Sequence, residues 1–129
     1  MKVQLVFPSG GAKLSSSGIL PPLGIVSLAS YIKEKDSSIQ VEIFDGEVDN
    51  EENIVKQLNG DIIGFSLTSA NFSNAFRIIK SIEKLDSKII LGGAESFSKL
   101  IILSKHLLLL QELKKMEKNH FMNMFWQLK

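Results

Sequence analysis

Residues 1–93 alternate between short apolar runs and longer segments in which apolar residues recur every three or four positions. The short runs have the length and pattern of β-strands and occupy residues 3–7, 39–45, 62–65 and 88–91. Strands separated by helices pair in parallel, because a crossover of that length returns the chain to the same end of a sheet. Since such crossovers are right-handed, the alternation predicts an α/β fold with a doubly wound parallel sheet in a three-layer α/β/α arrangement.

Apolar spacing and capping residues define the three expected helices. Pro21 and Pro22 preset the first turn of one helix, and Asn71 is a good N-terminal cap for the third. The apolar stripe of the first helix consists of Ile25, Leu28, Ala29 and Ile32, that of the second of Ile54, Val55 and Leu58, and that of the third of Phe72, Ala75, Phe76, Ile79 and Ile82. The run at 39–45 alternates apolar and polar residues, which predicts a strand near an edge of the sheet.

Composition limits the chemistry available to the chain. With 44% apolar and 22% charged residues, the 129-residue chain has the make-up of a soluble globular protein of about one domain. The absence of cysteine excludes disulfides, thiolate metal sites and an iron–sulfur cluster in this chain. The apolar run at the N-terminus is too short for a signal peptide, and the run at 100–110 is too short to span a membrane. We therefore expect a cytoplasmic protein without a membrane partner.

Catalytic and nucleic-acid-binding patterns are not evident. His106 and His120 have no second ligand at metal-binding spacing, and there is no Ser/His/Asp set or pair of catalytic carboxylates. The net charge of +1, without a basic and aromatic pattern, gives no indication of a nucleic-acid partner. We therefore predict no catalytic residue and no metal ligand in this chain.

The composition changes near residue 97. Six of the 15 Lys and Arg residues, but two of the 14 Asp and Glu residues, follow residue 98. The segment 98–113 has a helical apolar pattern, and further apolar residues follow as far as Trp126. We predict an α/β domain over 1–97 and an irregular, helical, apolar and basic tail over 98–129, a tail that offers a surface for homo-oligomer formation.

Small and hydroxyl-bearing residues follow the predicted strands. Ligands of open α/β sheets bind at the carboxyl ends of the strands. Ser66, Thr68 and Ser69 follow the third strand, where their hydroxyls and the next helix N-terminus suit a phosphate or an amide-rich ligand; the alternative is that one hydroxyl caps the helix. Gly92 and Gly93 end the fourth strand, where they either let the backbone approach a ligand or form a tight turn.

Two further loops carry weaker signals. The loop at 8–18 is rich in Gly and Ser, but it matches neither the phosphate-binding loop nor the dinucleotide fingerprint. Asp45 ends the second strand, where ribose-binding acids occur in nucleotide folds. Asp45 and Gly46 are also a common turn pair, and we interpret them as a turn.

Four segments in order resemble the N-terminal cobalamin-binding domain of cobalamin-dependent radical S-adenosylmethionine enzymes. They are residues 21–25 (PPLGI), 43–45 (IFD), 61–68 (DIIGFSLT) and 91–93 (LGG), and the resemblance covers about residues 2–96. It implies a flavodoxin-like, or Rossmann-like, sheet that holds a corrin ring over the carboxyl ends of its strands. It also implies that cobalamin, a corrinoid, is the cofactor of this chain.

The resemblance also implies roles for individual residues. Ser66 and Thr68 would line the pocket for the nucleotide tail of the corrinoid, and Gly92 and Gly93 would let that tail lie close to the backbone. Ser9 and Leu23 would face the ring. The predicted cofactor-binding set, completed from the loop after the third strand, is Ser9, Leu23, Gly64, Ser66, Thr68, Ser69, Gly92 and Gly93.

Two departures from the family shape the functional hypothesis. The Asp-x-His-x-x-Gly motif that supplies a lower cobalt ligand in other cobalamin domains is absent, and no His precedes His106. The three-cysteine motif of the family's catalytic barrel is absent too. We therefore expect a truncated product or a stand-alone domain that is not catalytic by itself and holds a corrinoid for a radical S-adenosylmethionine catalytic domain supplied in trans.

Two alternatives belong to other functional classes. One is a flavodoxin-like binder of flavin or a nucleotide that uses the loop at 9–17. The other is a protein without a ligand that forms oligomers through its apolar tail.

Overall fold

The computed structural model describes residues 1–11 and 21–93, which form four strands and three helices in strict alternation. In chain order these are β1 (Lys2–Phe7), α1 (Leu23–Lys35), β2 (Gln40–Asp45), α2 (Glu51–Gln57), β3 (Ile62–Ser66), α3 (Phe72–Ser81) and β4 (Lys88–Gly92). All strands are parallel, in the order β2-β1-β3-β4. The predicted α/β fold class is confirmed, as is the position of β2 at an edge of this sheet.

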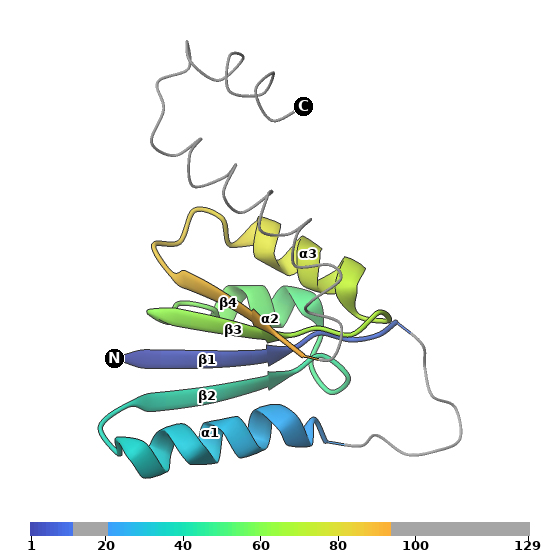
Figure 1. The fold of residues 1–129 in the computed structure, drawn as a ribbon. Helices are drawn as coiled ribbons and strands as arrows, with labels where there is room; N and C mark the ends of the chain where they lie inside the picture. Colours follow the sequence, from blue (N-terminus) through green and yellow to red (C-terminus); the bar gives the residue numbers. More distant parts are fainter. Residues whose placement is uncertain (12–20, 94–129) are drawn as a thin grey trace, which may run out of the picture. The chain divides into compact units, whose positions relative to one another are not determined.

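The strand order determines which face each helix covers. The chain steps from β1 to β2 in one direction, then returns past β1 to β3 and continues to β4. Because right-handed crossovers in opposite directions lie on opposite faces, α1 covers one face and α2 and α3 cover the other (Figure 1). The direction reverses between β1 and β3, which is the topological switch point of the sheet.

The two faces of the sheet are filled unequally. On the face of α2 and α3, Val6, Ile63 and Phe65 are buried, as are the helix residues Ile54, Ala75, Ile78 and Ile79. On the other face, Val3 and Leu5 form a smaller buried cluster with Ile25 and Ala29 of α1. Because α1 packs mainly over β1 and β2, the β3–β4 half of this face has no helix over it among the described residues (Figure 1).

One buried polar side chain ties the sheet to the turn after α2. Gln4 points to the face opposite α1, where its Oε1 atom accepts hydrogen bonds from the backbone N–H groups of Asn59 (2.8 Å) and Gly60 (2.7 Å). Its Nε2 atom donates to Glu42 Oε2 (2.6 Å) and to the carbonyl oxygen of Gln57 (3.1 Å). Gln4 is therefore a structural residue. Its polar atoms are hydrogen-bonded on the face of the sheet opposite α1.

Glu42 makes part of the stability of this sheet dependent on pH. Hydrogen bonds from Gln4 and Lys2 hold the pKa of its carboxyl group below the ordinary value of 4.5. A lowered folded-state pKa stabilises the fold fully above about pH 4.5, and this contribution is lost as the pH falls through the folded pKa. We expect Glu42→Gln to lower the free energy of unfolding at pH 7 by less than about 1 kcal/mol, because the pair is partly exposed.

The measurement is urea unfolding of both proteins between pH 7 and pH 3. The gap in unfolding free energy should close below about pH 4.5, where the Glu42 carboxyl becomes protonated. A gap that stays constant over this range would show that the ionised carboxylate contributes nothing. Glu52→Gln is the matched control, because the Glu52 side chain is 78% exposed and its only ion pair in the described residues is the surface pair with Lys56 on the same helix.

Candidate functional site

Small residues occupy the carboxyl half of β3 and β4 on the face of α1. Side chains alternate along a strand, so Ile62, Gly64 and Ser66 share this face. Gly64 pairs with Ile90, and Ser66 pairs with Gly92. A Cβ atom built on Gly92 would meet no heavy atom within 4 Å. The floor of this region is therefore backbone and one hydroxyl, with open space above Gly92 and the Leu5 side chain against Gly64.

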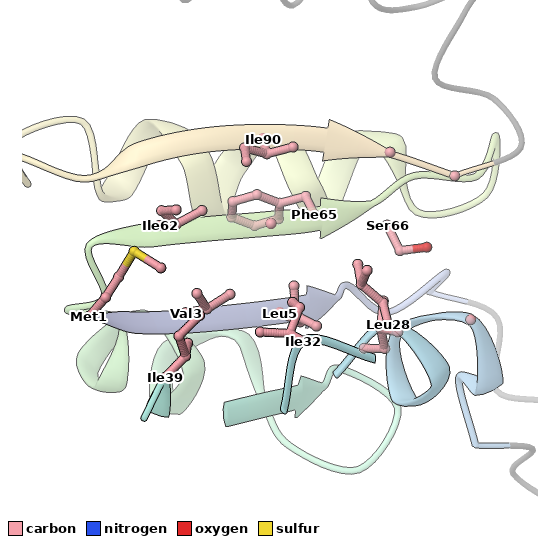
Figure 2. Close-up of a pocket in the computed structure, with 15 residues that line it drawn as sticks. Met1, Val3, Leu5, Leu28, Ile32, Ile39, Ile62, Phe65, Ser66 and Ile90 are labelled. Carbon is pink, nitrogen blue, oxygen red and sulfur yellow. The ribbon is translucent and has the colours of Figure 1, made fainter. Parts of the chain in front are cut away.

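Apolar walls turn this floor into a pocket, here called the switch-point pocket because it lies where β1 adjoins β3. Its volume is about 610 Å³, which is in the range of small-molecule sites. β1 supplies Val3 and Leu5, and α1 supplies Leu28 and Ile32 (Figure 2). Ser66 stands at one end of the pocket, and Met1, Ile39 and Ile62 lie at the other end (Figure 2).

The apolar stripe of α1 is divided between the core and this pocket. Ile25, which is 6% exposed, and Ala29 are buried as predicted, but Leu28 is 46% exposed and lines the pocket. Ile90 of β4 is likewise 47% exposed on the other side of the pocket. The apolar stripe predicted for this helix includes Leu28 without distinguishing it from Ile25 and Ala29, and the sequence pattern did not single out Ile90. The signal available for Ile90 was its place in the alternation of β4, two residues before Gly92.

The eight predicted cofactor-binding residues divide into two groups. Gly64, Ser66, Gly92 and Gly93 all line the switch-point pocket. Ser9, Leu23, Thr68 and Ser69 do not line it and belong to the segments at the carboxyl edge of the sheet. The structure thus brings four of the residues together in one hollow.

Thr68 and Asn71 hold the loop between β3 and α3. The backbone N–H of Thr68 donates to Asn71 Oδ1 (2.8 Å), and the N–H of Asn71 donates to Thr68 Oγ1 (3.2 Å). Asn71 Nδ2 also donates to the carbonyl oxygen of Ser66 (3.0 Å). Asn71 is the N-cap residue of α3, as predicted, but its side chain, 1% exposed, makes no capping hydrogen bond and binds back into the loop. The Thr68 hydroxyl accepts a hydrogen bond from the backbone N–H of Asn71 at the start of α3. This agrees with the alternative that one hydroxyl of this loop caps the helix.

The segments after β1, β2, β3 and β4 meet at one rim. The N–H of Gly10 donates to Glu47 Oε1 (2.8 Å), and Asn74 Nδ2 donates to the carbonyl oxygen of Ser9 (2.6 Å). Gly93, at φ +107°, packs against the backbone of Leu67. Turns far apart in the sequence therefore converge at the carboxyl edge, where open α/β sheets bind their ligands.

Asp45 forms a turn, as interpreted from the sequence. Its Oδ1 atom accepts from the N–H of Glu47 (3.0 Å), and its carbonyl oxygen accepts from the N–H groups of Val48 and Asp49. These bonds place Glu47 where it binds the N–H of Gly10. The carboxylate of Asp45 therefore stabilises the turn that positions Glu47 at the rim.

A family comparison agrees with this geometry. The model of the B12-binding domain family matches residues 11–108, which is more than half of the chain. This chain belongs to the B12-binding domain family. The comparisons with curated proteins and with solved structures found no match to this chain. The flavodoxin-like strand order β2-β1-β3-β4 is consistent with the family.

The described residues contain neither a cluster of metal-binding side chains nor a membrane-spanning helix. Among residues 1–11 and 21–93, no three His, Asp or Glu side chains lie close enough together to hold a metal ion. Within the same residues, no helix has the length and apolarity needed to cross a bilayer. The predicted tail over 98–129 lies outside the described residues, as do His106 and His120.

Proposed function

We propose that this chain binds cobalamin or a related corrinoid, with the nucleotide tail in the switch-point pocket and the corrin ring over the carboxyl edge of the sheet. One observation carries this proposal: in a member of the B12-binding family, the pocket at the β1–β3 switch point has a floor of Gly64, Ser66 and Gly92. A Cβ atom at Gly92 would enter open space. Such a floor suits a ligand that must lie directly on the backbone.

The residues present fit this ligand by their chemistry. Gly92 lets a ribose and phosphate approach the backbone closely, whereas Gly93 packs on Leu67 and forms the adjoining turn. Ser66 offers a hydroxyl that can donate or accept a hydrogen bond. The apolar end of the pocket suits an aromatic base. In this proposal Ser9, Leu23, Thr68 and Ser69 belong to the rim that faces the corrin ring, and the loops at Ser9 and Thr68 are held in place by the hydrogen bonds of Asn74 and Asn71.

The chain contributes binding and orientation, whereas bound cobalamin supplies the reactivity of its cobalt. No His occurs among the first 105 residues, so no imidazole of the described ranges serves as a cobalt ligand in this proposal. We further propose that the domain is not catalytic alone and presents the corrinoid to a radical S-adenosylmethionine catalytic domain in trans. An earlier-eluting complex after mixing the two proteins would support that partner, and separate elution would oppose it.

Gel filtration of the full chain with hydroxocobalamin tests the binding proposal. We expect the corrinoid to co-elute with the protein at micromolar concentrations and its absorption spectrum to change on binding. Flavin mononucleotide, which binds at the same switch point in flavodoxins, is the comparison ligand. Failure of hydroxocobalamin to co-elute would refute the proposal, and retention of flavin mononucleotide alone would support the flavin alternative.

A further inference from the structure

We infer that the switch-point pocket selects among corrinoids by the polarity of their lower base, and that it favours a hydrocarbon-rich base over a purine. The inference rests on the proposed function and adds the ligand class. Natural corrinoids carry different bases at the end of the nucleotide tail, among them 5,6-dimethylbenzimidazole, p-cresol and adenine. Dimethylbenzimidazole and p-cresol present methyl-bearing rings, whereas adenine presents ring nitrogens and an amino group.

The polarity of the pocket changes along its length. At the carboxyl edge the lining is Gly64, Ser66, Gly92 and Gly93, which offer backbone and a hydroxyl. Toward the amino end, Leu5 and Ile90 follow, with Met1, Ile39 and Ile62 at the far end (Figure 2). Ile62 and Ser66 are four residues apart on one strand, which is about 13 Å. A tail that enters at the carboxyl edge therefore places its linker beside polar groups and its base among aliphatic side chains.

Among the described residues that line the pocket, Ser66 alone has a hydroxyl, amide or ionisable side chain. Met1 adds its thioether sulfur and the N-terminal amino group at the far end. In the middle of the pocket, the strand β3 pairs with β1 on one side and with β4 on the other, so its backbone polar groups are engaged in the sheet. A purine at this depth would lose water from its amino group and ring nitrogens without gaining partners. A dimethylbenzimidazole or p-cresol ring has fewer polar atoms to desolvate and gains more from apolar burial.

The test compares the affinities of four corrinoids for the full chain by equilibrium dialysis. They are cobalamin, its analogue with adenine as lower base, its analogue with p-cresol, and cobinamide, which has no nucleotide. We expect the adenine form to bind about 10- to 100-fold more weakly than cobalamin, which is the discrimination that apolar pockets achieve against added polar groups. The p-cresol form should bind about as well as cobalamin, although its ring cannot coordinate cobalt, because apolar burial sets the preference.

Each outcome separates this inference from the proposed function. Equal binding of cobalamin and the adenine form would refute the inference while leaving corrinoid binding intact. Binding of cobinamide as tight as that of cobalamin would place the tail outside the pocket and also refute it. Absence of binding by all four ligands would refute the proposed function itself.

A variant pair locates the preference within the pocket. Ile90 is 47% exposed, so Ile90→Thr adds a hydroxyl to the apolar part of the pocket while retaining a β-branched strand residue. We expect this variant to reduce the discrimination against the adenine form to less than about tenfold. Val48→Thr, at a 75% exposed position that does not line the pocket, is the matched control and should retain the full discrimination. Unchanged discrimination in Ile90→Thr would contradict the inference.

Discussion

Replacement of Gly92 by leucine should abolish corrinoid binding while leaving the fold intact. Gly92 lies in the floor of the switch-point pocket, and a Cβ atom there meets no heavy atom within 4 Å. The Cβ atom of a leucine would therefore meet no protein atom, and the rest of its side chain would compete with the nucleotide tail for the space above the floor. We expect affinity for cobalamin to fall by at least about 100-fold, or about 2.7 kcal/mol. Equilibrium dialysis gives the affinity, and thermal unfolding checks the fold.

A graded series at Gly92 separates blockage from unfolding. Gly92→Ala adds one methyl group and should weaken binding less than Gly92→Val, which in turn should weaken it less than Gly92→Leu. The free energy of unfolding should stay within about 0.5 kcal/mol of the original or rise, because glycine in a strand is entropically costly. If Gly92→Leu bound cobalamin normally, the tail would not lie on the floor of this pocket.

The course of the chain could be predicted from residue periodicity alone. The alternation at 39–45 indicated an edge strand, and β2 is at an edge. The helical spacing of Ala75, Ile79 and Ile82 identified the buried side of the third helix. Periodicity succeeds for these elements because each has a neighbour on the face that it buries, so local pattern and tertiary packing agree.

The walls of the pocket could not be predicted in the same way. Ile25 and Leu28 are three residues apart and therefore lie on the same side of a helix. Ile25 is nevertheless buried, whereas Leu28 is exposed and lines the pocket. The difference depends on the sideways position of α1 over β1 and β2, which no local pattern encodes. The exchange of hydrogen bonds between Thr68 and Asn71 was missed for a related reason, since a loop side chain can bind either the helix end or the loop itself.

Gly93, which follows Gly92 at the end of β4, has a structural role. Its replacement by alanine should destabilise the protein strongly. Gly93 has φ +107°, a region that side-chain-bearing residues rarely adopt. A Cβ atom there would lie 2.6 Å from the backbone nitrogen of Leu67 and would also contact the Leu67 carbonyl oxygen. These are backbone atoms at the end of a central strand, so they cannot move aside as a flexible side chain would. We expect a loss of at least about 2 kcal/mol in unfolding free energy, measured by urea denaturation.

Gly92→Ala is the matched control, because it makes the same chemical change one residue earlier, where a methyl group meets no neighbour. The N–H of Leu67 donates to the carbonyl oxygen of Gly92 (2.7 Å), so both glycines adjoin the same junction of β3 and β4. Equal stability of the two alanine variants would show that the junction can relax around Gly93. Unequal stability, with the loss confined to Gly93→Ala, would mean that one glycine forms the turn and leaves its neighbour free to contact a ligand.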